Sequence, residues 1–170
     1  MRRLRAAAGS SLFFALAPGV LAGLVPWRLT GWRGEAPPAL QVLGAALLVA
    51  GAAVLVHAFA RFVMEGIGTP APVAPTEHLV VGGLYRCVRN PMYLAVEATI
   101  LGQALLLGRP VLLAYGAAFA AVVYAFVRLY EEPALTRRFG VAYERYRREV
   151  PGWWPRAKPT NAAGSPELRH

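Results

Sequence analysis

The chain has 170 residues, of which 56% are hydrophobic and only 16% are charged, and its mean hydropathy is +0.42. These values exclude an ordinary soluble domain and indicate one small integral membrane domain. The net charge of +9 does not indicate a nucleic-acid partner. The basic residues cluster at 1–5 and 128–158, on either side of the apolar segments, where anionic membrane lipid is the fitting partner. The single cysteine, Cys87, excludes an internal disulfide and a cysteine-based metal cluster.

Four apolar segments approach the length of ~20 residues that crosses a hydrocarbon core, although the third has only about 17. The first follows "MRRLR" and contains Pro18 and Pro26, and we interpret it as a retained membrane anchor rather than a cleaved signal peptide. The motif "GRP" between the last two segments leaves room only for a tight turn between antiparallel helices. The predicted spans are residues 11–29, 39–62, 91–107 and 110–129.

The distribution of arginine predicts how these spans are oriented. If the N-terminus is cytoplasmic, four spans place the loop at residues 61–90 and the arginine-rich tail on the cytoplasmic side as well, which satisfies the positive-inside rule. The opposite side would carry Arg28, Arg33 and Arg109. We therefore expect a polytopic protein of the bacterial inner membrane, with both termini in the cytoplasm.

The loop "GIGTPAPVAPTEHLVVGGLYR", residues 66–86, is stiffened by prolines and ends in an apolar stretch. Irregular backbone at a membrane surface is tolerated only where protein or a wet cavity covers it. We expect "HLVVGGLY" to lie at that surface under such a cover. The alternative is an ordinary connecting loop.

After the fourth span, Pro133 predicts that the helix ends or kinks at Glu132 and that a new helix begins with proline in its first turn. Apolar residues then recur every three or four positions, which is typical of an amphipathic helix. We expect this helix to lie on the cytoplasmic interface, followed by aromatic anchors in "PGWWP". Residues 1–158 would form a single all-α domain and residues 159–170 a disordered tail. The apolar stripe consists of Leu135, Phe139, Tyr143, Tyr146 and Val150.

The turn at "GRP" also predicts which polar residues meet. In two antiparallel helices joined near residue 109, positions whose numbers sum to about 218 lie side by side. Arg128 should therefore lie opposite Asn90, and Glu132 should lie near Arg86. Three alternatives remain open. Glu131 and Glu132 are simply charges at the membrane edge, solvated or paired with nearby arginines, and Arg128 merely extends to the interface. The tyrosines at 85, 93, 143 and 146 form only an aromatic belt.

Glu97 lies inside the third predicted span, where an ionisable group is costly. It should face a partner or a wet cavity, unless it reaches water near the helix end. His57, His78 and His170 are scattered without metal-ligand spacing, so we expect no metal site.

Two segments carry a resemblance to a known family. "EHLVVGGLYRCVRNPMY" and "EEPALTRRFGVAYERYRREVPGWWP" resemble the isoprenylcysteine carboxyl methyltransferases and the related phospholipid methyltransferases. The pattern of that family is a Gly-x-Tyr turn, Arg-His-Pro-x-Tyr, a helical hairpin, Glu-Glu-x-x-Leu, Phe-Gly-x-x-Tyr-x-x-Tyr and Val-Pro. The similarity covers residues 77–155, and the first two spans add nothing to it.

The resemblance implies S-adenosylmethionine as methyl donor on the cytosolic side and a lipophilic or prenyl-type acceptor that enters from the bilayer. It also implies that Arg128 faces the acceptor. A carboxylate near a helix break suits a cationic donor, and methyl transfer mainly requires in-line placement and exclusion of water. The residues implied to contact the donor are Glu77, His78, Leu79, Val80, Tyr85, Asn90, Pro91, Met92, Tyr93, Glu131 and Glu132.

Asn90 stands where the family pattern has histidine. An asparagine can hydrogen-bond a ligand but cannot titrate near neutral pH. Two alternatives to a methyltransferase therefore remain. One is an NADPH-dependent reductase, because sterol reductases resemble the same membrane superfamily, and the other is a noncatalytic membrane scaffold. The short chain and the Glu-Glu motif favour the methyl donor, whereas Asn90 favours the scaffold.

Overall fold

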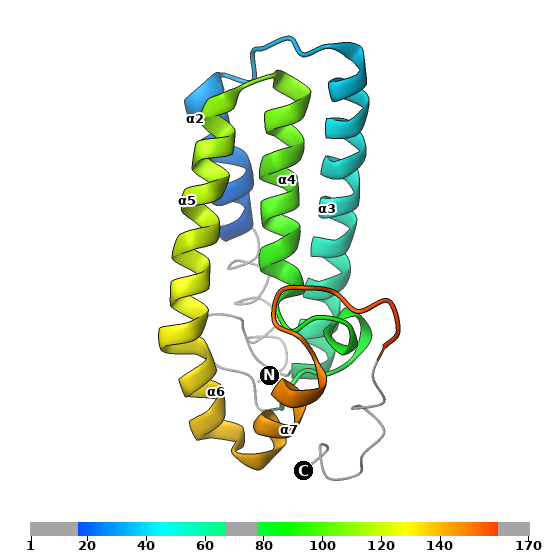
Figure 1. Cartoon of the computed structure of the whole chain (residues 1–170), viewed down its shortest axis with the longest axis vertical. Coiled ribbons are helices and arrows are strands. Elements are labelled where there is room, and N and C mark those ends of the chain that lie inside the picture. The colour runs from blue at the N-terminus through cyan, green and yellow to red at the C-terminus, as the bar shows by residue number, and fades with distance from the viewer. Residues whose placement is uncertain (1–16, 67–77, 160–170) are drawn as a thin grey trace, which may run out of the picture. The chain divides into compact units, whose positions relative to one another are not determined.

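The structure is a computed structural model, and it describes residues 17–66 and 78–159. Within these ranges the chain forms helices and turns and no β-strand, so the all-α prediction is confirmed for this part of the molecule. Figure 1 labels the α-helices. The elements are the π-helix η1 (Val20–Leu24), α2 (Val25–Thr30), α3 (Pro38–Gly66), the 3-10 helix η2 (Gly83–Arg86), α4 (Pro91–Leu107), α5 (Pro110–Phe126), the π-helix η3 (Val127–Glu131), α6 (Glu132–Phe139) and α7 (Val141–Glu149).

The chain divides into two compact units. The described part of the first unit comprises residues 17–56 and 92–125, and that of the second comprises residues 57–66, 78–91 and 126–159. The first unit contains most of the apolar helices, and the second contains most of the polar residues singled out from the sequence.

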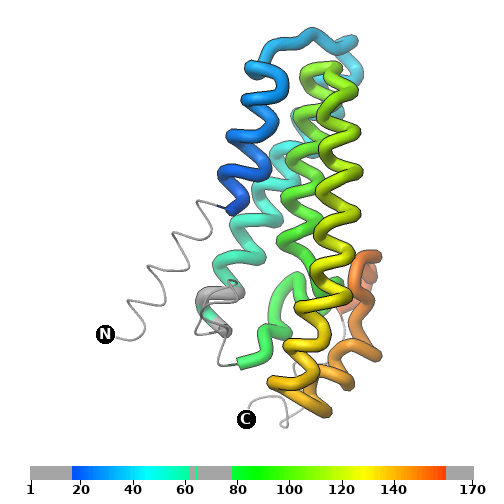
Figure 2. The backbone as a smooth tube through the Cα atoms, turned by 90° about the vertical axis from the view of Figure 1, so that its left-hand side faces the viewer, coloured from blue at the N-terminus to red at the C-terminus, as the bar shows by residue number. Residues whose placement is uncertain are grey.

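In the first unit, α3 and α4 approach each other closely because glycines face the contact (Figure 2). A Cβ atom added at Gly44 would lie 2.5 Å from the backbone nitrogen of Leu106, and one added at Gly102 would lie 2.7 Å from that of Leu48. Contact through small residues is typical of helices in membranes, where the hydrophobic effect does not drive helices together and close packing is needed instead.

The turn predicted from "GRP" joins α4 to α5. Gly108 has a φ of 61°, which glycine adopts without strain. The Nε of Arg109 donates a hydrogen bond of 2.7 Å to the carbonyl oxygen of Arg33 in the α2–α3 connection. Arg33 and Arg109 therefore lie at the same end of the first unit.

Two helical runs are long and apolar enough to cross a membrane. Pro38–Arg61 has 24 residues with a mean hydropathy of 2.3, and Pro110–Phe139 has 30 residues with a mean hydropathy of 2.0. Only 17% and 28% of their most apolar windows are buried inside the protein, so most of this apolar surface is available to lipid. The predicted count of four spans stays a prediction, because α4 is shorter and the first span is only partly described.

Two prolines inside helical runs are each preceded by a π-helical turn. The N–H of Val25 bonds the carbonyl of Val20 just before Pro26, and the N–H of Glu132 bonds the carbonyl of Val127 just before Pro133. Proline has no backbone N–H to donate, and its ring needs room next to the preceding turn. The wider i→i+5 turn accommodates both features. As predicted, a new α-helix begins with proline in its first turn, because α6 starts at Glu132. The helical run nevertheless continues without a break from Pro110 to Phe139, since η3 joins α5 to α6.

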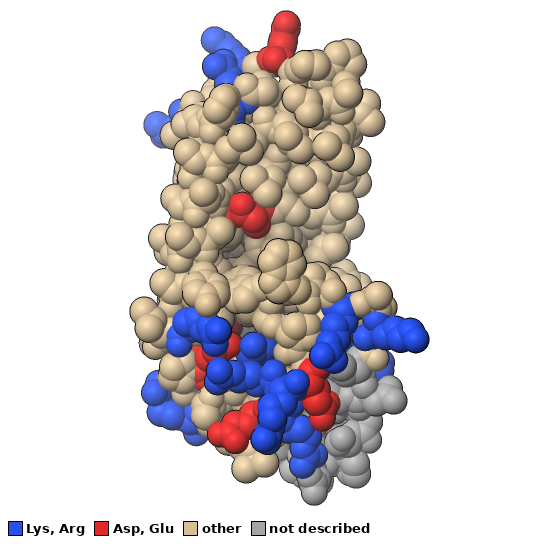
Figure 3. Space-filling model, in the orientation of Figure 1, with Lys and Arg blue, Asp and Glu red and all other residues tan. Residues whose placement is uncertain are grey.

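In the second unit, the predicted amphipathic helix is two helices. Gly140 separates α6 from α7. Its backbone angles, φ 52° and ψ −127°, are ones that glycine adopts readily and that other residues rarely adopt. The predicted apolar stripe nevertheless gathers into one cluster, in which Tyr143 and Tyr146 pack with Leu79 and Val81. Leu79 and Val81 thus cover part of the stripe, and the predicted position of these helices on the cytoplasmic interface stays a prediction. Figure 3 shows basic side chains gathered over α6 and α7, interspersed with acidic ones.

Candidate functional site

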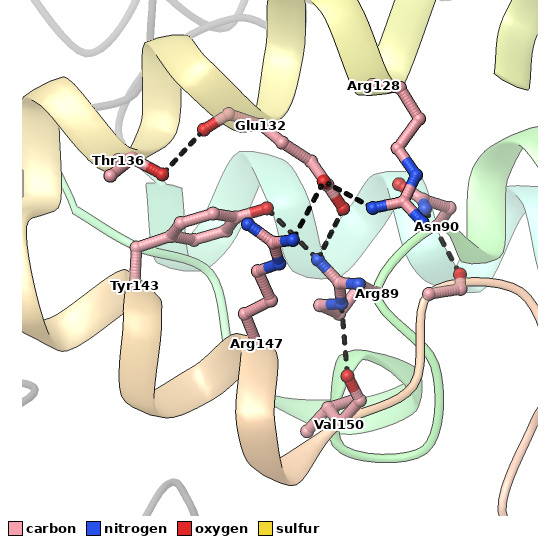
Figure 4. A network of polar contacts seen from close by, with 9 residues as sticks. Arg89, Asn90, Arg128, Glu132, Thr136, Tyr143, Arg147 and Val150 are labelled. Carbon is pink, nitrogen blue, oxygen red and sulfur yellow. Dashed lines mark hydrogen bonds and ion pairs between the residues drawn. The ribbon is translucent and has the colours of Figure 1, made fainter. Parts of the chain in front are cut away.

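Glu132 is the centre of a polar network in the second unit (Figure 4). It is the first residue of α6, and its side chain is 7% exposed. Its Oε1 accepts a hydrogen bond of 2.8 Å from Arg89, and its Oε2 accepts one of 3.2 Å from Arg128. The Nη2 of Arg147 lies 3.9 Å from Oε2. A carboxylate buried to this degree requires partners, and three guanidinium groups supply them.

Arg89 ties the network to the backbone. Its side chain is 12% exposed. Besides the bond to Glu132, its Nε donates a hydrogen bond of 3.0 Å to the carbonyl of Val150, and its Nη1 donates one of 3.2 Å to the hydroxyl oxygen of Tyr143. The buried cation therefore has one opposite charge and two neutral acceptors. A buried ion pair is tolerated when its remaining donors are satisfied in this way.

A C-terminal strap, residues 150–153, lies along the segment that carries Arg89 and Asn90. The backbone N–H of Arg89 donates a hydrogen bond of 2.9 Å to the carbonyl of Pro151, and Nδ2 of Asn90 donates one of 3.1 Å to the carbonyl of Gly152. Asn90 is 8% exposed. Its amide nitrogen therefore holds the strap in place.

Two tyrosines of α7 complete the network. Tyr143 and Tyr146 are both buried, and burial raises the pKa of each hydroxyl, so both stay neutral. At Tyr143, the positive charge of Arg89 opposes this shift in pKa and the negative charge of Glu132 adds to it. The hydroxyl of Tyr146 donates a hydrogen bond of 2.7 Å to the carbonyl of Tyr85, which links α7 to η2.

The second unit gathers most of the residues predicted to contact the donor. Val80 is buried there, whereas His78 is exposed. Met92 and Tyr93 lie in the first turn of α4 and belong to the first unit, and Glu77 lies outside the described residues. The predicted donor contacts described in the second unit are His78, Leu79, Val80, Tyr85, Asn90, Pro91, Glu131 and Glu132.

Sequence reasoning missed Arg89, Arg147 and the strap as parts of the network. The numbering of the antiparallel helices predicted a cation near Glu132 but named Arg86, whereas the partner at 2.8 Å is Arg89. Arg147 does not belong to the apolar stripe predicted from the sequence. It follows Tyr143 by four residues, which puts both on the same face of α7, and that spacing was the available signal. The strap acts through backbone carbonyls, which residue types do not reveal.

Glu97 of α4 belongs to the first unit. A Cβ atom added at Gly116 of α5 would lie 2.8 Å from its Oε1, and its buried Oε2 has no hydrogen-bond partner among the described residues. That Glu97 faces a partner or a wet cavity stays a prediction. The described residues also include no group of three or more His, Cys, Asp or Glu that could hold a metal ion.

A family model described as phospholipid methyltransferase matches residues 39–142, which is more than half of the chain. The matched range includes Arg89, Arg128 and Glu132, whereas Arg147 and the strap lie beyond it. Neither a curated protein nor a solved structure gives a significant match.

Proposed function

The chain belongs to the phospholipid methyltransferase family, and on this premise we propose that it transfers a methyl group from S-adenosylmethionine to a lipophilic acceptor at the cytoplasmic face of a membrane. Family membership supports methyl transfer in general, and the two long apolar helical runs support a membrane location. The observation that carries the proposal is the buried pair of Arg89 and Glu132. These residues are 43 positions apart, and they join the two segments that resemble the family.

The charges of the network fit the amino-acid end of the donor, which bears one carboxylate and one ammonium group. Arg89 is a suitable partner for a carboxylate, and Glu132 is a suitable partner for an ammonium group. Both oxygens of Glu132 already accept hydrogen bonds. An ammonium group would therefore share or replace the bond from half-exposed Arg128 rather than the bond from buried Arg89. When bound, the donor supplies an electrophilic methyl group on sulfur.

The chain's own residues would position ligands and exclude water, as methyl transfer requires. Asn90, which replaces the family histidine, takes a positioning role because its amide nitrogen bonds the carbonyl of Gly152. Tyr143 and Tyr146 are buried and neutral, so they add polar atoms without adding charge. We propose that the acceptor is a small lipophilic or prenyl-type molecule and that both chain termini lie in the cytoplasm.

Calorimetry of the purified full chain in detergent, titrated with S-adenosylhomocysteine, tests this function. We expect saturable binding of one equivalent and no binding of NADPH. Preferential binding of NADPH would instead favour a reductase. A folded protein that binds neither nucleotide would favour a noncatalytic scaffold and would refute the proposal.

A further inference from the structure

The strap is bonded to two residues at the centre of the candidate site. Arg89 donates to it from Nε and from its backbone N–H, and Asn90 donates to it from Nδ2. Figure 4 shows the two bonds made by the side chains. Beyond the strap, the backbone N–H of Arg156 donates a hydrogen bond of 3.1 Å to the carbonyl of Cys87. Residues 150–156 are therefore held along residues 87–90, and each of these bonds uses a backbone group of the C-terminal segment.

The position of the strap affects the residues proposed to hold the donor. A Cβ atom added at Gly152 would lie 3.0 Å from Nη2 of Arg89, so the strap and this guanidinium group pack closely. Arg89 also donates to the buried carboxylate of Glu132. A strap that moved away would withdraw two acceptors from Arg89 and one from Asn90. It would thereby loosen the buried pair on which the proposed function depends.

The hydrogen bonds hold the strap only weakly by themselves. The net contribution of a hydrogen bond to stability is of the same order as the cost of fixing the backbone of one residue. Four such bonds fix residues 150–156. Val150 is buried in the cluster around Tyr143, but residues 154–158 are all exposed. A partner that binds this exposed end would therefore shift the strap toward its bonded position.

The exposed end has the composition of a membrane-interface anchor. Trp154 is 84% exposed, Arg156 and Lys158 are both exposed, and residues 154–158 include no acidic residue. An indole ring favours the level of the lipid headgroups, and basic residues beside it are attracted to anionic lipid. The chain also has two helical runs that are long and apolar enough to cross a membrane. A lipid surface therefore lies within reach of this segment and fits its charge.

We propose that residues 154–158 bind the anionic surface of the membrane and that this contact holds the strap against Arg89 and Asn90, so that anionic lipid raises the affinity of the donor site. This inference rests on the proposed function, because it takes the donor to bind beside these two residues. It adds a regulatory role for Arg156 and Lys158, which lie beyond the family match at residue 142. The ligand of this surface is the lipid layer itself and not the methyl acceptor.

The test measures binding of S-adenosylhomocysteine to the full chain by calorimetry, in nanodiscs of phosphatidylcholine with and without phosphatidylglycerol. This ligand has no net charge near neutral pH, so the surface potential does not itself concentrate it at the disc. We expect about fivefold tighter binding in the anionic discs, which corresponds to the attraction of one basic residue to the surface. The double variant Arg156→Gln/Lys158→Gln should remove this difference, and so should high salt. The control, Arg137→Gln/Arg148→Gln, loses two charges at exposed residues of α6 and α7 and should keep the difference.

Fluorescence quenching tests the contact with lipid without the donor. Brominated phosphatidylcholine should quench part of the tryptophan fluorescence, and Trp154→Phe should lower the quenched part. If Trp154→Phe leaves the quenched part unchanged, residues 154–158 do not contact the membrane as proposed. Circular dichroism and size-exclusion chromatography of each variant check that it folds.

The outcomes separate this inference from the proposed function. If the unmodified chain binds S-adenosylhomocysteine in neither disc, the proposed function fails, and regulation of the donor site by lipid fails with it. If the chain binds equally well in both discs, only the regulation by lipid fails. A lipid dependence that survives Arg156→Gln/Lys158→Gln, or that the control variant loses equally, would assign the effect to a diffuse basic surface and overturn the inference.

Discussion

Replacing Glu132 with glutamine should destabilise the second unit, because it leaves the buried cation of Arg89 without an opposite charge. The two side chains are 12% and 7% exposed, and their atoms are 2.8 Å apart. Removing one partner of a buried ion pair costs about 3–5 kcal/mol. Glutamine keeps one acceptor oxygen, and Arg89 keeps its bond to the carbonyl of Val150. We therefore expect a smaller loss of unfolding free energy for Glu132→Gln, about 2–3 kcal/mol.

Thermal unfolding in detergent measures this loss. For a chain of this length, 1 kcal/mol lowers Tm by about 2–4 °C, so Glu132→Gln should lower Tm by about 4–12 °C. Arg128→Gln is the control. It breaks the ion pair to the same carboxylate at a half-exposed position, which contributes at most about 1 kcal/mol. If the two variants lower Tm equally, the buried pair with Arg89 does not stabilise the unit as argued. At a temperature at which the unmodified chain and the variant are both folded, Glu132→Gln should also weaken binding of S-adenosylhomocysteine by about 1.5–3 kcal/mol.

Three further predictions follow from the structure. Arg128→Lys should lower methyl transfer while S-adenosylhomocysteine still binds, because lysine lacks the planar fork; unchanged turnover would remove Arg128 from acceptor binding. Gly102→Ala should lower the free energy of unfolding by about 1–3 kcal/mol, because its Cβ would lie 2.7 Å from the backbone nitrogen of Leu48. The control is Gly23→Ala, whose Cβ meets nothing within 4 Å and which should be neutral or slightly stabilising in thermal unfolding. In a Cys87→Ser background, cysteine introduced at Gly108 should react with a membrane-impermeant reagent only from the non-cytoplasmic side. Labelling from the cytoplasm would contradict the four-span orientation.

The helices of the first unit were predictable because apolar runs are bounded by residues with strong backbone preferences. The predicted span at 91–107 coincides with α4, which begins at Pro91 and ends before Gly108. Proline is favoured in the first turn of a helix, and glycine readily takes the positive φ that ends one. Local sequence is sufficient where such residues stand at both ends of an apolar run.

The break at Gly140 was not predictable from the apolar stripe. A glycine within an amphipathic pattern is compatible with an unbroken helix, and only the contacts of the folded chain decide the outcome. Here Tyr143 and Tyr146 pack with Leu79 and Val81, which lie more than fifty positions earlier in the chain. That packing selects the glycine conformation that turns α7 back toward Glu132. The same turn brings Arg147 to the carboxylate, so the missed break and the missed arginine have one cause.

The range of the family match suggests that the residues of the polar network have different roles. Arg89, Arg128 and Glu132 lie within residues 39–142, whereas Arg147 follows the turn at Gly140 and lies beyond that range. Arg89 and Glu132 are buried, so they can hold a ligand only if they stay paired and rigid. Arg147 is half exposed and bonds the carboxylate only through a long ion pair, so it can change partner at little cost in stability. We therefore expect substitutions at the buried pair to impair donor binding and stability together, and substitution of Arg147 to cost less stability than either.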